Sequence, residues 1–137
     1  MEKHLELSDE EFLRQFTGCH LDPSIFSHEA HLRLAWINIT KYGIVQATEN
    51  IQSQLLKFVE SVGDSDKYNK TLTIASMFVV NHFIQRSESS NFPDFISEFS
   101  KLKTGLKSLI SSHYSIDVFT SQKAKEEYLE PDLLPFE

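Results

Sequence analysis

Two histidines, His28 and His31, stand three residues apart, immediately after Ser27, a residue type that often caps helices. Residues at this spacing lie on one face of a helix. Two imidazoles on one face can hold a metal ion, relay a proton or bind a polar ligand. Near a helix N-terminus the free N–H groups disfavour a positive charge, so we expect both rings to be neutral, the form that binds metals. Glu29 is expected to point to solvent.

A metal site requires further ligands, since two histidines supply only half of a tetrahedral zinc site. His113 is the best third ligand, because it lies in a polar break, Ser112 to Ser115, between apolar segments. His82 fits less well because it follows a long apolar run. One hypothesis is therefore a divalent transition metal bound by His28, His31 and His113. The other is that these histidines are structural and form hydrogen bonds in a cap or in the core. No catalytic residue can be assigned in either case.

Hydroxyl groups gather in a second segment, from Lys67 to Thr73. Tyr68, Thr71 and Thr73 bracket the expected start of a helix, where side chains and free N–H groups can hold an anion or a carbonyl oxygen. The alternative hypothesis is that Asn69 caps this helix and that the threonine hydroxyls bind the helix backbone.

The C-terminal segment, 129–137, contains two prolines and several apolar residues, which predicts an extended tail packed on the rest of the domain. A tail in that position could bring Asp132 near a pocket. Tyr114, beside His113, is a further candidate for binding a ligand there. In the alternative hypothesis the tail binds a protein partner.

Helix signals divide the chain into regular segments. Ser8 and Glu11 form a capping box, and Ser27 and Ser121 are further N-caps. The segment 28–42 carries apolar residues on two sides, which predicts a central helix. No segment alternates as a strand would. The predicted fold is therefore all-α: a single domain, 1–137, forming an orthogonal or up-down bundle of five to seven helices, with helices over 9–16, 28–42, 45–62, 69–85, 93–102, 106–111 and 122–128.

Composition narrows the function classes. The 137 residues carry a formal net charge of −7, with 20 Asp and Glu against 13 Lys and Arg, which disfavours nucleic acid as a partner. The densest basic segment, 101–107, is expected to be a solvated helix end rather than an anion site. No apolar run approaches the roughly 18 residues that a membrane helix needs, and the N-terminus does not resemble a signal peptide. The single cysteine, Cys19, fits a reducing compartment. We therefore expect a cytoplasmic protein whose partner is a small-molecule ligand or another protein.

Four short motifs follow one another along the chain: Phe26-x-His28-x-x-His31-Leu32, Lys67-Tyr68-x-x-Thr71-x-Thr73, His113-Tyr114-Ser115 and Pro131-Asp132-Leu133-x-Pro135. In these motifs the chain resembles a family of short, uncharacterised bacterial all-helical proteins. The resemblance also implies that relatives carry a histidine at the position of Asn69. If that histidine is a metal ligand in the relatives, this chain lacks one ligand, because asparagine is a poor ligand for zinc. It implies that seven residues belong together: His28, His31, Tyr68, Thr71, Thr73, His113 and Asp132.

Two functional hypotheses follow. In the first, a histidine-lined pocket binds a metal ion or a small polar ligand. In the second, the protein is a non-catalytic helical module that binds a protein partner or assembles with itself. Convergence of the histidines with Tyr68 and Thr71 on one concave pocket would favour the first hypothesis.

Overall fold

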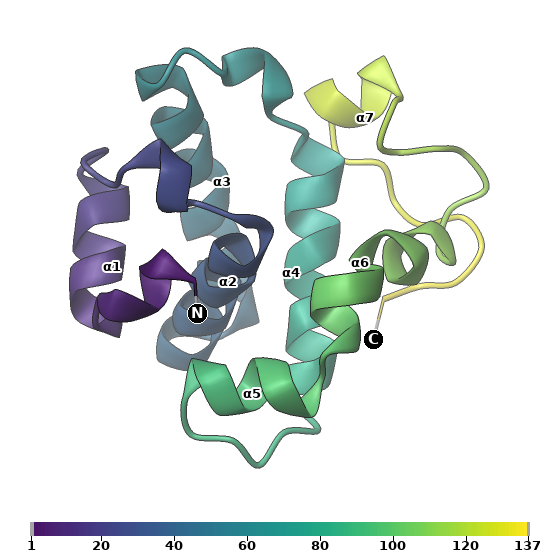
Figure 1. Ribbon diagram of the computed structural model, residues 1–137. Coiled ribbons are helices and arrows are strands. Elements are labelled where there is room, and N and C mark those ends of the chain that lie inside the picture. Colours follow the sequence, from purple (N-terminus) through teal and green to yellow (C-terminus); the bar gives the residue numbers. More distant parts are fainter. Residues whose placement is uncertain (1, 137) are drawn as a thin grey trace.

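The computed structural model describes residues 2–136, and every regular element in this range is a helix (Figure 1). Three 3₁₀ turns, Lys3–Glu6, Pro23–Ile25 and Ser65–Lys67, precede α1, α2 and α4. The all-α prediction is confirmed. Among the described helices, none has the length and apolar character needed to cross a membrane. The seven α-helices are α1 (Asp9–Thr17), α2 (His28–Tyr42), α3 (Ile44–Ser61), α4 (Lys70–Ile84), α5 (Phe92–Glu98), α6 (Lys101–Ser111) and α7 (Gln122–Glu126).

Polar caps explain where most of these helices begin. Between α2 and α3 only Gly43 intervenes, and its φ of 82° lies in the left-handed region that glycine adopts without strain. That residue lets the chain turn sharply from one long helix into the next. Five polar side chains each accept a hydrogen bond from a backbone N–H in the first turn of the following helix: Ser8, Ser27, Asn69, Asn91 and Ser121.

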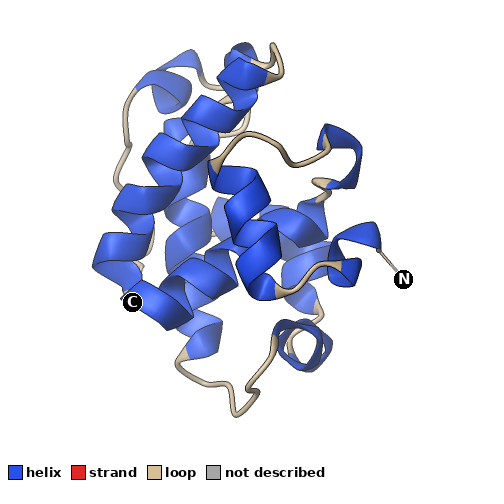
Figure 2. Ribbon diagram, turned by 90° about the vertical axis from the view of Figure 1, so that its left-hand side faces the viewer, coloured by secondary structure: helices blue, strands red, loops and turns tan. Residues whose placement is uncertain are grey.

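Helix α4 occupies the middle of the molecule, with α2 and α3 on one side and α6 and α7 on the other (Figure 1). It packs against all four of these helices. The view turned by 90° shows that the described chain consists of helices and connecting loops alone (Figure 2). The candidate site described below lies between α4 and two of these neighbouring helices, α2 and α3.

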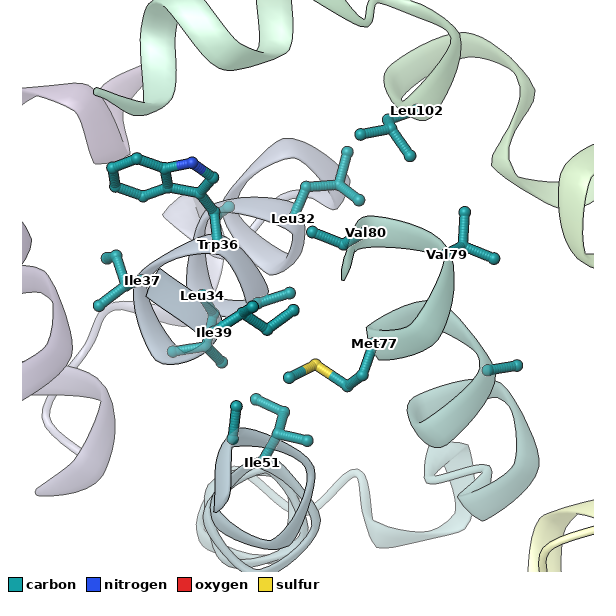
Figure 3. Close-up of a cluster of buried hydrophobic side chains, with 14 of the residues drawn as sticks. Leu32, Leu34, Trp36, Ile37, Ile39, Ile51, Met77, Val79, Val80 and Leu102 are labelled. Atoms are coloured by element: carbon teal, nitrogen blue, oxygen red, sulfur yellow. The ribbon is translucent and has the colours of Figure 1, made fainter. Parts of the chain in front are cut away.

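The core forms where α2 meets α3, α4 and α6 (Figure 3). Helix α2 is buried without interruption from Leu32 to Ile39, which confirms the prediction of a central helix. Its side chains face apolar residues of three other helices, which the close-up labels Ile51 on α3, Met77, Val79 and Val80 on α4, and Leu102 on α6.

The predicted boundaries were wrong in the C-terminal half. A helix was expected over 93–102, but α5 ends at Glu98 because Phe99 leaves the helical conformation, with φ −122° and ψ 59°. The Phe99 ring instead packs against Phe83, at 5.1 Å between ring centroids. The next helix begins at Lys101 rather than 106, and its interior is kinked at Gly105. The last helix ends at Glu126, before the predicted end at 128.

Candidate functional site

A cavity of about 610 Å³ lies among α2, α3, α4 and the 3₁₀ turn before α4. Its wall is largely apolar, with Phe58 and Leu55 of α3 facing Met77 of α4. The N-terminal ends of α2 and α4 both reach it. Six of its polar or charged lining residues come from the two sequence motifs at these helix starts: His28, His31, Lys67, Tyr68, Asn69 and Thr73.

His31 has a defined orientation. Its Nδ1 lies 2.9 Å from the carbonyl oxygen of Ser27, and its ring stacks on Phe26 with 3.8 Å between centroids. Because a carbonyl oxygen can only accept, Nδ1 carries the proton. Nε2 forms no hydrogen bond within residues 2–136. In the neutral ring this nitrogen is an acceptor at the wall of the cavity.

The electrostatic surroundings keep this ring neutral. Desolvation by the surrounding protein lowers the pKa of His31, the nearby His28 lowers it further, and the hydrogen bond to Ser27 opposes the shift. The ring is nevertheless accessible to solvent because it faces the cavity. His31 is therefore a neutral acceptor that a ligand in the cavity can reach.

His28 joins α2 to α6. Its Nε2 lies 3.3 Å from the carbonyl oxygen of Leu102, a long hydrogen bond, and its side chain is exposed. The expectation that Glu29 points to solvent was wrong. Glu29 is buried and accepts a 2.7 Å hydrogen bond from Nε2 of His4, and Nζ of Lys103 lies 3.1 Å from its other oxygen. The N-terminal segment folds over this face of α2, which the local helix pattern does not encode.

Tyr68, Asn69 and Thr73 show the structural role that was one of the two hypotheses. Asn69 Oδ1 accepts from the N–H of Leu72, and its Nδ2 donates to the carbonyl oxygen of Val118. The hydroxyl of Thr73 donates to the Asn69 carbonyl oxygen. Burial raises the pKa of Tyr68, and a hydrogen bond with Thr73 opposes that shift. The amide of Asn69 is thus committed to the fold although it lines the cavity.

Four other predicted site residues lie elsewhere. Thr71 is fully buried; its hydroxyl donates to the Glu127 carbonyl oxygen and accepts from the N–H of Leu129. His113, Tyr114 and Asp132 hold the C-terminal tail against the preceding loop. We call this set of contacts, between His113–Ser115 and Leu129–Phe136, the tail clasp. The seven residues that the family resemblance groups together therefore do not form one site. His28, His31, Tyr68 and Thr73 line the cavity, His113 and Asp132 belong to the tail clasp, and Thr71 belongs to neither.

Most hydrogen bonds of the tail clasp join a side chain to a backbone group. Nδ1 of His113 donates to the Leu134 carbonyl oxygen at 2.7 Å, and the Tyr114 hydroxyl donates to the Leu129 carbonyl oxygen at 2.8 Å. Asp132 accepts hydrogen bonds from the N–H and the hydroxyl of Ser115. Burial raises the pKa of Tyr114 well above its ordinary value. As predicted, the tail is extended and packs back on the domain; Glu137 lies outside the described residues.

The structure does not bring His113 to His28 and His31, so the predicted third metal ligand is absent from the cavity. Metal binding by His28 and His31 themselves stays a prediction. Within residues 2–136, one group offers three ligand atoms within 4.8 Å of one another: Glu2, His4 and Glu29.

That group is built as an ion-pair network. Nη1 of Arg33 lies 3.4 Å from Nδ1 of His4, so its positive charge disfavours a proton there. Nε2 then carries the proton and donates it to Glu29, which blocks metal coordination at that nitrogen. Burial opposes ionisation of Glu29, but His4 and Lys103 together hold the pKa of its carboxyl group below the usual range. The network stabilises a folded N-terminal segment, and sequence reasoning missed it because its members are up to 101 positions apart, from Glu2 to Lys103.

Comparison of the chain with protein-family models, with curated proteins and with solved structures finds no match. The family resemblance of the four motifs therefore stays a prediction.

Proposed function

We propose that this protein binds a small organic molecule in the cavity, with an apolar body among α2, α3 and α4 and a hydrogen-bond donor directed at Nε2 of His31. The observation that carries the proposal is the unpartnered, neutral acceptor of His31 at the wall of a largely apolar cavity. A volume of about 610 Å³ lies within the usual range for small-molecule sites.

The composition of the wall supports an organic ligand. Apolar side chains provide affinity for a hydrophobic body, while a few polar groups fix its orientation. The charges of Asp64 and Lys67 at the wall compensate each other, since Nζ of Lys67 lies 3.6 Å from a carboxylate oxygen of Asp64. The lining of the cavity therefore favours a neutral, apolar ligand over a bare ion.

A neutral fluorescent probe tests the proposal. N-Phenyl-1-naphthylamine is apolar and carries one N–H donor, so we expect saturable binding with one site per chain and increased fluorescence. Ser76 lines the cavity and its hydroxyl forms no hydrogen bond within residues 2–136. The Ser76→Phe variant should therefore fill the cavity and abolish binding.

Ser108→Phe is the matched control, because Ser108 is exposed on α6 and does not line the cavity. Circular dichroism and the unfolding temperature establish that both variants fold. Wild-type protein that fails to bind the probe saturably, or a folded Ser76→Phe protein that binds it as well as wild type does, would refute the proposal. That result would favour the protein-interaction hypothesis instead.

A further inference from the structure

We infer that the ligand is an organic anion, whose acidic group lies in a second cavity beside Lys107 while its apolar body lies in the first. This inference rests on the proposed function and specifies the class of ligand. The second cavity has a volume of about 370 Å³. It shares four lining residues with the first cavity: His28, Leu72, Ser76 and Leu106. The two cavities are therefore neighbours, and the inferred ligand extends across both.

The second cavity differs from the first in its charge. Among residues 2–136, the charged residues that line it are Lys103 and Lys107, and none of the lining residues is acidic. This is unexpected in a protein with a net charge of −7. Positive groups without acidic neighbours at a concave site attract anions.

The two lysines are not equivalent. Nζ of Lys103 lies 3.1 Å from Glu29 and 3.7 Å from Glu2, so two carboxylates already compensate its charge. Lys107 forms no ion pair within residues 2–136. Its Nζ lies 5.4 Å from the centre of the Phe119 ring, a cation–π contact that positions the ammonium group at the cavity. The uncompensated charge of the site is therefore that of Lys107.

His28 stands at the junction of the two cavities. Because a carbonyl oxygen can only accept, Nε2 of His28 donates to the Leu102 carbonyl oxygen. Leu72 also lines both cavities. An apolar cavity that contains the His31 acceptor, beside a cavity that contains an uncompensated ammonium group, suits a carboxylic acid whose apolar body carries one hydrogen-bond donor.

Displacement of the neutral probe by two ligands of equal length tests this inference. Decanoate and 1-decanol share the apolar chain and differ in the charge of the head group; at pH 8 the carboxyl group is ionised. We expect decanoate to displace the probe from wild-type protein at about a tenfold lower concentration than 1-decanol. Salt should reduce this advantage because it screens the ion pair.

Variants at Lys107 locate the acidic group. Lys107→Gln should remove most of the advantage of decanoate and leave displacement by 1-decanol unchanged, whereas Lys107→Arg should retain the advantage. Lys101→Gln is the control, since Lys101 is an exposed lysine of the same helix and lines neither cavity. It should leave both ligands unaffected.

The outcomes separate the inference from the proposed function. Equal displacement by decanoate and 1-decanol overturns the inference while the proposed function stands. An advantage of decanoate that survives Lys107→Gln overturns the placement of the acidic group. Failure of the probe itself to bind overturns the proposed function.

Discussion

Histidine side chains have different roles at different positions of this fold. Nδ1 of His31 and Nδ1 of His113 each face a backbone carbonyl oxygen, and Nε2 of His4 faces a buried carboxylate. These histidines differ in what surrounds the second nitrogen of the ring. In His4 it faces a guanidinium group, whereas in His31 it faces a cavity. The residue type alone therefore does not distinguish a structural histidine from one that can meet a ligand.

The depressed pKa of His31 predicts how stability depends on pH. Below about pH 6.5 the unfolded chain binds a proton at this histidine that the folded protein resists. Its contribution is therefore fully present above pH 6.5 and is lost as the pH falls through the lower, folded-state pKa. We expect the free energy of unfolding, measured by urea denaturation, to decrease in this range, and the decrease to be smaller in His31→Asn.

Two features make this result specific. The pKa of Glu29 is also lowered, but its contribution is lost only as the pH falls below its ordinary value of 4.5, a separate range. His20→Asn is the control because His20 is exposed. If the pH dependence of His31→Asn matched that of wild type between pH 5 and 6.5, the assignment of a depressed pKa to His31 would be incorrect.

At the scale of elements, helix α4 is attached to the C-terminal part of the chain by its first turn. The Thr71 hydroxyl spans the Glu127 carbonyl oxygen and the Leu129 N–H, and Asn69 donates to the Val118 carbonyl oxygen. The side chains that begin α4 thus also fix where α7 and the tail lie. This explains why the conspicuous Thr71 of the second motif lies outside the cavity.

Thr71→Val is expected to destabilise the protein by about 1–3 kcal/mol, because it leaves a backbone donor and a backbone acceptor unpartnered at a fully buried position. Chemical denaturation measures the change. Thr48→Val is the matched control, since the Thr48 hydroxyl only donates to the Ile44 carbonyl oxygen of its own helix. Equal destabilisation by the two substitutions would mean that Thr71 does not anchor the tail.

For the molecule as a whole, the N-terminal segment joins helices that are distant in sequence. The His4 ring is fully buried and contacts Phe12 of α1 and Phe92 of α5. Its Nε2 binds Glu29 of α2, which also pairs with Lys103 of α6. A segment that precedes the first α-helix therefore contributes to the packing of four helices.

His4→Ala should lower the free energy of unfolding by about 3 kcal/mol, because it leaves Glu29 without its buried partner and opens a cavity beside two phenylalanine rings. A thermal unfolding series measures this. His20→Ala, at an exposed position, should change stability by no more than about 0.5 kcal/mol. If the two variants were equally stable, the N-terminal segment would not be part of the cooperative unit.

Much of the secondary structure could be predicted from local signals. The caps at Ser8, Ser27 and Asn69 act over three residues, so they are visible in any short window of sequence. The end of α5 could not be predicted in this way, because Phe99 leaves the helix where its ring packs against Phe83 of α4.

The features of the candidate site also differ in whether local sequence signals could predict them. The sequence by itself determined that His28 and His31 share the first turn of a helix and that Tyr68 to Thr73 begin another, since helix periodicity and capping are local. Only the tertiary structure decided that these two helix starts line one cavity and that His113 belongs to the tail clasp. It also decided that Lys103 is paired, whereas Lys107 forms no ion pair with any residue between 2 and 136. Those outcomes depend on how helices pack and on which charges meet across the fold, and no short-range rule in the sequence specifies such contacts.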